Sequence, residues 1–214
     1  MFGVSISESM VLRGGDGNDT IYAGGFSTGD GSDYVSNHSV DFEDAANGYI
    51  YLYGDDGHDE LVGADEVPFQ YLFGGEGDDL IRGGYQGTSD GGSEGLFYAD
   101  GGAGDDIIQP YQYYDDVDID ILIRGGKGND KINVYEGSDL YDTDGSIDSS
   151  VYLRRVADDS KGRLTFDGGE GDDEIWMMQD WSNSDNDHPR LYGGNGDDIL
   201  KGAIDTENGM LIAG

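Results

Sequence analysis

One nine-residue pattern recurs along almost the whole chain. It reads Gly-Gly-x-Gly-x-Asp-x-apolar-x, and residues 193–201 form a complete copy. Six copies keep all three glycines and the aspartate, and a seventh has Asp55 in place of the second glycine. The copies start at Gly14, Gly54, Gly74, Gly101, Gly125, Gly168 and Gly193. Such repetition predicts a solenoid, in which each repeat buries its apolar face only against its neighbours.

Each position of the pattern has its own chemical role. The glycines permit backbone angles that a Cβ would resist, so the chain turns tightly and directs several carbonyl oxygens inward. The sixth position supplies a carboxylate, and the eighth supplies one apolar side chain to a short strand. The carboxylates are Asp19, Asp59, Asp79, Asp106, Asp130, Asp173 and Asp198, and the apolar residues are Ile21, Leu61, Ile81, Ile108, Ile132, Ile175 and Leu200. Carbonyls and carboxylates are the ligands that Ca²⁺ accepts, roughly six to eight at a time and in loose geometry.

The copies resemble the calcium-binding nonapeptides of the repeats-in-toxin (RTX) family, and the resemblance covers nearly the whole chain. It implies an all-β fold, a parallel β-roll or β-helix solenoid, in which stacked coils form two parallel sheets. It also implies that each calcium ion lies between the loops of neighbouring coils. One loop supplies the carbonyls of its first and third positions, the next supplies those of its second and fourth, and the aspartate of each completes the shell.

The resemblance carries over to this sequence residue by residue. The ion between the last two loops would take oxygens of Gly168, Glu170 and Asp173 from one loop and of Gly194, Gly196 and Asp198 from the other. Over the whole array, the implied ligands besides the seven motif aspartates are Gly14, Asp16, Gly54, Asp56, Gly74, Gly75, Glu76, Gly77, Gly101, Gly102, Ala103, Gly104, Gly125, Gly126, Lys127, Gly128, Gly168, Gly169, Glu170, Gly171, Gly194 and Gly196. Several calcium ions are therefore the expected cofactor.

The spacing of the copies departs from that of a regular RTX array, in which nonapeptides follow one another directly. Here the starts lie 40, 20, 27, 24, 43 and 25 residues apart, so every coil carries extra chain. Apolar residues before each motif predict a strand that leads into the loop. They are Leu12, Leu52, Leu72, Ala99, Ile123, Phe166 and Leu191 two positions before the first glycine, and Met10, Ile50, Phe97, Ile121 and Leu164 four positions before it. We expect irregular, lengthened coils with one regular calcium-loop edge and one decorated edge.

Two of the spacings are too long for one plain coil. The insertion at 24–48 holds a second carboxylate-rich stretch. The insertion at 134–162 contains a strand-like segment at 151–156 and is followed by another at 163–166. These two segments form either a β-hairpin or an additional coil without calcium, and the sequence leaves both open. We expect residues 1–214 to form one elongated domain. Because the last strand ends where another loop would begin, we also expect the chain to be a fragment of a longer array.

The charge of the chain explains why bound cations would matter. It has 46 acidic and 11 basic residues, a net charge of −35, and 39 glycines, a composition that by itself favours disorder. If each of the six gaps between adjacent loops holds one Ca²⁺, the ions cancel about 12 charges and turn repelling carboxylates into cross-links. Nucleic acid is excluded as a partner because its binding needs a basic footprint. Direct membrane insertion is not expected, because no apolar run approaches a membrane span.

The absence of cysteine excludes disulfides, cysteine-ligated zinc and thiol catalysis. Calcium outside the cell can provide the cross-links that disulfides provide in other small secreted domains. The N-terminal residues lack the basic and apolar regions of a cleavable signal peptide, and the resemblance implies export by a type I route. We therefore expect an extracellular location, either secreted or at the cell surface.

No group of residues favours catalysis. His38, His58 and His188 are isolated, and carboxylate pairs such as Asp78 and Asp79 recur in register with the motif, which favours calcium ligation over glycosidase chemistry. We therefore expect no enzyme but a module that folds on binding calcium. It would serve as a structural or interaction part of a secreted or surface protein, with another surface protein as one class of partner.

The alternative function is a carbohydrate-binding accessory module of a secreted polysaccharide-active enzyme. Its candidate glycan-binding residues are Tyr113, Trp176 and Trp181, because solvent-facing aromatic rings stack on sugars. Aromatic side chains that cap the core of the decorated edge explain the same residues. The two interpretations differ in whether the rings are exposed.

Overall fold

The computed structural model describes residues 9–23, 48–64, 67–84, 94–110, 118–134, 163–177, 180–181, 190–202, 205–206 and 211–214. All regular elements in these ranges are strands. The long sheet contains, side by side in this order, β1 (Ser9–Asp16), β3 (Tyr49–Asp56), β5 (Phe69–Glu76), β7 (Glu94–Ala103), β9 (Asp118–Lys127), β11 (Leu164–Glu170), β14 (Arg190–Asn195) and β17 (Leu211–Ala213). The described residues include no helix long and apolar enough to cross a membrane.

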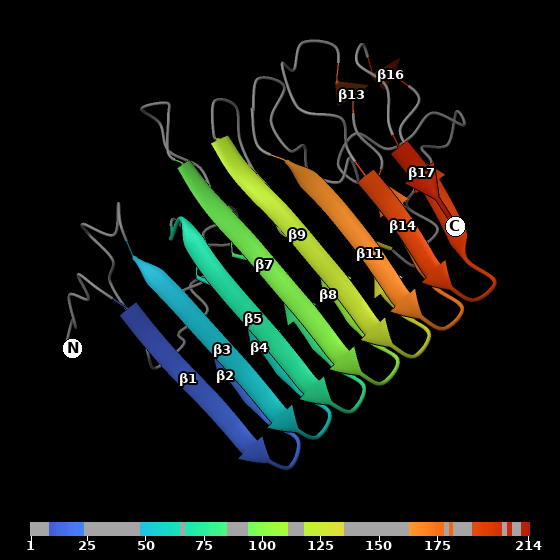
Figure 1. Ribbon diagram of the computed structural model, residues 1–214. Coiled ribbons are helices and arrows are strands. Elements are labelled where there is room, and N and C mark those ends of the chain that lie inside the picture. Colours follow the sequence, from blue (N-terminus) through green and yellow to red (C-terminus); the bar gives the residue numbers. More distant parts are fainter. Residues whose placement is uncertain are drawn as a thin grey trace, which may run out of the picture.

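The second sheet is made of short strands and lies behind the long one (Figure 1). Its strands are β2 (Thr20–Tyr22), β4 (Glu60–Val62), β6 (Leu80–Arg82), β8 (Ile107–Gln109), β10 (Lys131–Ile132), β12 (Glu174–Met177) and β15 (Ile199–Gly202). A separate pair is formed by β13 (Asp180–Trp181) and β16 (Asp205–Thr206). Every strand pair is parallel. The predicted all-β, parallel β-roll is therefore confirmed.

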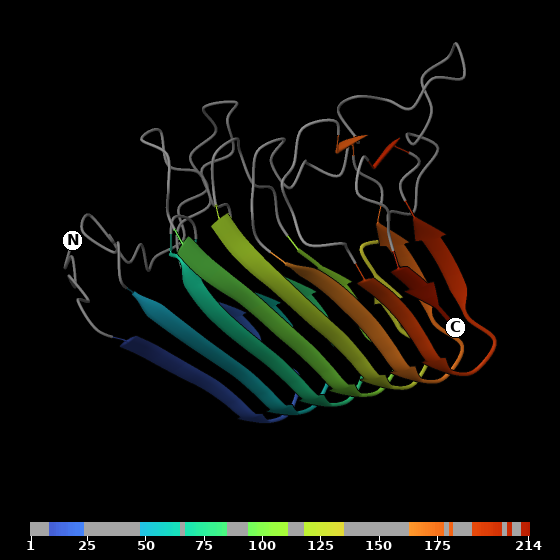
Figure 2. The same cartoon turned by 45° about the horizontal axis from the view of Figure 1, so that its top comes forward.

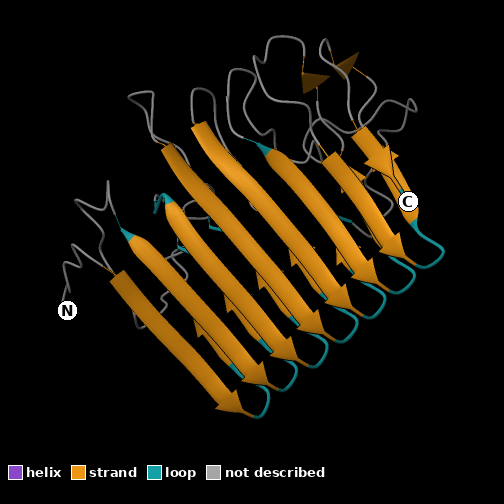
Figure 3. Ribbon diagram, viewed as in Figure 1, coloured by secondary structure: helices purple, strands orange, loops and turns teal. Residues whose placement is uncertain are grey.

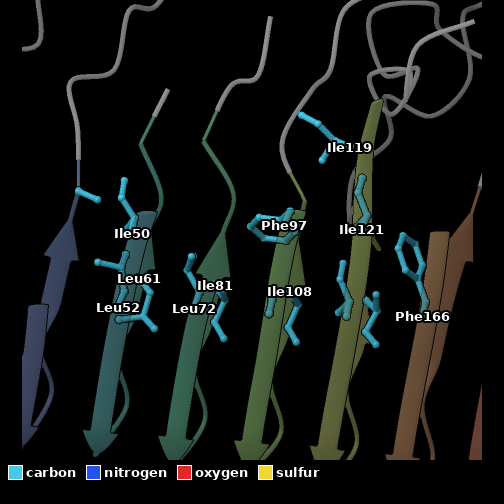
Figure 4. Packing of buried hydrophobic residues seen from close by; sticks show 14 of the residues in the cluster. Ile50, Leu52, Leu61, Leu72, Ile81, Phe97, Ile108, Ile119, Ile121 and Phe166 are labelled. Carbon is cyan, nitrogen blue, oxygen red and sulfur yellow. The ribbon is translucent and has the colours of Figure 1, made fainter. Parts of the chain in front are cut away.

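Each coil consists of a long strand, a tight loop and a short strand on the opposite sheet. The core lies between the two sheets, where inward side chains of successive coils pack in rows (Figure 4). Leu52 and Leu72 come from the long strands and Leu61, Ile81 and Ile108 from the short ones, and all five are fully buried. The apolar positions chosen from the sequence thus form the interior, as expected for strands with one buried face.

The shortest coil contains a buried glutamine where the other coils place an apolar side chain. Gln70 is 1% exposed, and its amide donates to the carbonyls of Ala64 (2.9 Å) and Val67 (3.1 Å). Its Oε1 accepts the N–H of Ala64 at 3.1 Å. A buried amide is tolerated when its hydrogen bonds are satisfied. Gln70 therefore ties the short return of this coil to the long sheet.

Residues 164–166 of the segment expected as a hairpin arm or an additional coil belong to β11, which pairs in parallel with β9 on one side and β14 on the other. This strand precedes the sixth loop. The other segment of that alternative, 151–156, lies outside the described residues. Residues 24–47 and 135–162, which hold nearly all of both long insertions, lie outside the described residues.

Candidate metal centre

The seven glycine-rich loops stack along one edge of the roll (Figures 2 and 3). The second positions of successive loops are direct neighbours: Gly15 with Asp55, Asp55 with Gly75, Gly75 with Gly102, Gly102 with Gly126, Gly126 with Gly169 and Gly169 with Gly194. The register is therefore constant although the spacing in sequence varies twofold. All the extra chain is accommodated between the short strands and the next long strands.

The loop that lacks the second glycine keeps the same backbone conformation. Asp55 has a φ of 73°, which aspartate tolerates better than most residues. Its carboxylate accepts a hydrogen bond from the Arg13 guanidinium at 2.7 Å. This copy is therefore a full member of the stack.

Each motif aspartate after the first uses one carboxylate oxygen to join its loop to the preceding one. The backbone N–H of Asp79 donates to Oδ1 of Asp106 in the next loop at 2.8 Å. The same bond, 2.7–3.0 Å long, joins Asp19 to Asp59, Asp59 to Asp79, Asp106 to Asp130, Asp130 to Asp173 and Asp173 to Asp198. The six bonds form a continuous ladder that orients the six carboxylates from Asp59 to Asp198 in the same way.

The other oxygen of each carboxylate is buried without a partner. Oδ2 has no hydrogen bond at Asp19, Asp59, Asp79, Asp106, Asp130, Asp173 or Asp198. An unpaired buried carboxylate oxygen is costly and rare in proteins. That all seven motif aspartates show it indicates that these residues fit a cation and do not reflect a local defect.

A carbonyl oxygen of the following loop lies beside each of these oxygens, except at the last loop. A Cβ added to Gly101 would lie 2.2 Å from Asp106 Oδ2 and 2.5 Å from the carbonyl oxygen of Gly125. The same pair of oxygens surrounds Gly14, Gly54, Gly74, Gly125 and Gly168. The first glycine of the motif is therefore required because a side chain would fill the space where two oxygens from adjacent loops converge.

Electrostatics inside the stack disfavours the charged carboxylates. Burial raises the pKa of Asp106 to about 8, of Asp130 to about 7 and of Asp79 to about 6, and neighbouring aspartates add to the shift while the backbone hydrogen bond opposes it. Burial also raises the pKa of Asp173. A bound divalent cation would reverse these shifts, because it is the largest charge in such a site.

The donor set fits Ca²⁺. Among the described residues, no three histidine, cysteine, aspartate or glutamate side chains converge on one point, so backbone carbonyls must complete the shell. The loops provide them: the carbonyls of Gly75 and Gly77 face the next loop, each 2.2 Å from the Cβ position of Gly102 or Gly104. Glu76 turns its carbonyl towards the preceding loop, where it accepts the N–H of Gly57 at 2.7 Å. Such a shell of hard oxygens suits calcium better than zinc or copper.

The direction of the carbonyls differs from the expected one. Between the last two loops, the carbonyl of Gly193 lies beside Asp173 Oδ2, whereas the carbonyl of Gly168 lies beside Asp130 Oδ2 in the preceding gap. The carbonyls of the first and third motif positions thus face the preceding loop, and those of the second and fourth positions face the following loop. The assignment of the Gly168, Glu170, Gly194 and Gly196 carbonyls to the last gap is therefore wrong. The carbonyls that face this gap are those of Gly169, Gly171, Gly193 and Asn195. The sequence could not show this because the motif is identical in both directions of stacking.

Trp176 is not a glycan-stacking residue. It is 8% exposed, its Nε1 donates to Glu174 Oε1 at 2.8 Å, and Lys201 Nζ covers the ring 3.8 Å from its centroid. The ring is therefore covered by side chains of the short sheet, and Trp176 is not part of the hydrophobic core cluster. Tyr113 and the side chain of Trp181 lie outside the described residues.

Comparison with known families gives a result that agrees with this geometry. The RTX calcium-binding nonapeptide repeat matches the chain in four copies, at residues 11–25, 71–85, 122–149 and 190–205. Four stretches of the chain are thus similar to the RTX repeat. The four matches contain the loops that start at Gly14, Gly74, Gly125 and Gly193, and the other three loops continue the same register. No match was found among curated proteins or among solved structures.

The repeats support a calcium-binding β-roll module. The RTX repeat is a structural calcium-binding repeat rather than a catalytic family, and it is typical of secreted proteins. The resemblance stated from the sequence is therefore confirmed at the level of the repeat and of the fold.

Proposed function

We propose that this chain is one elongated RTX β-roll domain that folds when several Ca²⁺ ions bind between its loops outside the cell. The observation that carries the proposal is the row of seven buried, unpartnered Asp Oδ2 atoms, six of which lie beside a carbonyl oxygen of the next loop. Seven stacked loops leave six gaps, so we propose up to six ions. The role is structural, as part of a secreted or surface protein that contacts another surface molecule.

Each ion is held by six loop residues, three from each side of the gap. For the gap between the fourth and fifth loops, the ligands are the carbonyls of Gly102 and Gly104, the carboxylate of Asp106, the carbonyls of Gly125 and Lys127, and Asp130. When bound, the ion supplies the positive charge that the buried carboxylates lack. Mg²⁺ should substitute poorly, because it requires near-octahedral geometry and dehydrates reluctantly.

In this proposal, the calcium concentration makes folding depend on whether the chain is inside or outside the cell. At low cytosolic calcium, the net charge of −35 keeps the chain expanded, which suits export through a type I channel. At high external calcium, ions that bind only the folded chain shift the equilibrium towards it. Folding therefore follows export.

Far-UV circular dichroism tests this function. The EDTA-stripped chain is titrated with CaCl₂, and a parallel titration with MgCl₂ is the control. A cooperative increase in β-structure with Ca²⁺ alone supports the proposal. A chain that is fully folded in EDTA would contradict it, because burial of the strands would then suffice without the ions.

The carbohydrate-binding alternative now rests on Tyr113 and Trp181 only. A glycan array probed with the calcium-loaded chain tests it. Loss of a glycan signal in Trp181→Ala, with the calcium response unchanged, would favour this second function. The absence of any signal would remove it.

A further inference from the structure

The residue at the fifth position of the motif precedes the calcium-binding aspartate but has different surroundings. The sixth-position aspartates from Asp59 to Asp173 are buried. The fifth-position residues lie on the outside of the loop edge, and all of them are exposed: Asn18, His58, Asp78, Asp105, Asn129, Asp172 and Asp197. Adjacent carboxylates such as those of Asp78 and Asp79 are therefore not equivalent, and the use of the first one needs its own explanation.

The fifth-position side chains form a second hydrogen-bond ladder along the loop edge. The backbone N–H of Asn129 donates to Oδ1 of Asp105 in the preceding loop at 2.8 Å. The same bond, 2.8–3.1 Å long, joins His58 to Asn18, Asp78 to His58, Asp105 to Asp78, Asp172 to Asn129 and Asp197 to Asp172. At His58 the acceptor is Nδ1, which requires the tautomer with its proton on Nε2. These bonds run opposite to those of the sixth-position ladder, in which the N–H of one loop donates to the following loop.

Each gap between loops is therefore crossed by two opposed side-chain bonds. Between the fourth and fifth loops, the N–H of Asn129 bonds back to Asp105, and the N–H of Asp106 bonds forward to Asp130 at 2.9 Å. The carbonyls of the first four motif positions face the gaps. They remain available to an ion only if the N–H groups of the fifth and sixth positions find acceptors elsewhere, because buried and half-buried N–H groups are rarely left unpaired. The two side chains supply those acceptors.

The residue types at the fifth position share an acceptor atom but not a charge. Aspartate occurs four times, asparagine twice and histidine once. In all three the accepting atom is attached directly to Cγ. Glutamate would place its oxygens one bond farther from the backbone, and alanine has no acceptor. Asn18 and Asn129 make the same bond as the aspartates although they are neutral, so the ladder does not depend on charge.

We propose that the fifth motif residue is a positioning residue for calcium. Its acceptor holds the following loop at the separation at which oxygens of both loops reach one ion. The inference rests on the proposed function, because it concerns how tightly each gap binds calcium. The residue does not touch the ion and acts through the backbone N–H that it holds. Where the motif contains two successive aspartates, asparagine can therefore replace the first but not the second.

Three variants at one position separate the acceptor from the charge. Asp105→Asn keeps the acceptor without the charge, Asp105→Glu keeps the charge but moves the acceptor one bond farther out, and Asp105→Ala removes both. Isothermal titration calorimetry of the whole chain gives the number of ions at saturation. Mixing the calcium-loaded chain with an excess of a fluorescent chelator in a stopped-flow instrument gives the rate at which each ion leaves.

The variants are expected to bind as many ions as the wild type and to differ in release. One ion should leave Asp105→Ala and Asp105→Glu about two- to tenfold faster than it leaves the wild type, since about one net hydrogen bond across its gap is lost. Asp105→Asn should release calcium like the wild type. Asp106→Asn provides the contrast: it keeps an acceptor for the sixth-position ladder but weakens a ligand, so it should bind fewer ions.

A second pair of variants keeps the test decisive if Asp105→Ala does not fold. Asp172→Ala and Asp172→Asn repeat the comparison at the gap between the sixth and seventh loops, where Oδ1 of Asp172 accepts the N–H of Asp197 at 2.8 Å. The same result is expected there: one ion leaves faster in the alanine variant and none in the asparagine variant.

Four results would overturn the proposal. Faster release in both the asparagine and the alanine variant would show that the charge matters, and a smaller number of ions in Asp105→Ala would make the residue a ligand. Equal acceleration of all ions would show a general loss of stability, and unchanged release in Asp105→Ala would show that the bond is dispensable. A wild type that binds no calcium would overturn the proposed function and this inference together, so the two failures are distinguishable.

Discussion

Interior and terminal loops have the same sequence pattern but different surroundings. Asp106 and Asp130, with a loop on each side, are 0% and 1% exposed, whereas Asp198 in the last loop is only partly buried. Ile108 is fully buried, whereas Leu200, at the same motif position on the edge strand β15, is only partly buried. The contribution of one nonapeptide to the stability of the roll is therefore not fixed. Its contribution depends on how many neighbours it has, as in a one-dimensional array.

The largest difference is expected for the aspartates. Asp106→Ala should remove two calcium ions, because Asp106 borders two gaps, and Asp198→Ala should remove one. Isothermal titration calorimetry of both variants against the wild type gives the stoichiometry. Equal losses in the two variants would break the comparison, since they would mean that each aspartate ligates only one ion.

The second-position glycines provide the next largest contrast. Gly102 has a φ of +110°, and a Cβ there would lie 2.2 Å from the carbonyl oxygen of Gly75, whereas Gly15 has a φ of +99° and no atom within 4 Å. Gly15→Ala should destabilise the calcium-loaded roll by about 1–2 kcal/mol through backbone strain alone. Gly102→Ala adds a clash with backbone, so it should cost about 4 kcal/mol or more. Urea unfolding in calcium measures both. If the two variants lost similar amounts of unfolding free energy, the neighbouring loop would have to shift readily to make room for the added methyl group.

The response to pH should have opposite signs with and without calcium. In EDTA, the pKa values of Asp79, Asp106 and Asp130 in the folded chain are about 6 to 8, above the ordinary 3.8. The folded state then binds more protons, so its stability falls as the pH rises from about 4 to about 8. In calcium, protons compete with the ion for the same carboxylates, so acid weakens binding.

Circular dichroism at about pH 8 and about pH 5 checks this sign change. The lower value stays above the isoelectric point of about 4.1. In EDTA the β-signal should increase at the lower pH, and in limiting calcium it should decrease. An EDTA form that loses β-structure on acidification would mean that the buried carboxylates are not what opposes folding.

The smallest effect is expected in the core. Ile108 on β8 is fully buried, and Ile21 on β2 of the first coil is 9% exposed. Ile108→Val should destabilise the roll by about 1 kcal/mol, and Ile21→Val by about half of that, because the cavity at an end coil collapses more easily. Thermal unfolding in calcium compares the two variants. A larger loss at Ile21 would indicate that the end coil is packed as tightly as the interior.

Most of the fold was predictable because it repeats. The position of Asp106 in its motif was enough to predict its loop, and Ile108 was enough to predict the strand after it. Irregular positions were not predictable in this way. The glutamine at position 70 breaks the apolar pattern, and only its bonds to Ala64 and Val67 show why it is tolerated. The pairing of Arg13 with Asp55 likewise joins residues 42 positions apart that no local pattern relates.

The sequence alone determined the loops, the strands that flank them and the aspartates, because glycine conformation and the alternation of apolar residues are local properties. Only the tertiary structure decided which neighbouring loop each carbonyl faces, as Gly168 and Gly193 show, since the motif reads the same whichever way the coils stack. It also decided that Trp176 is covered while Tyr51 and Tyr71 stack on the outer face of the long sheet. Burial depends on what packs against a residue, and in this chain the neighbours come from coils 20 to 43 residues away.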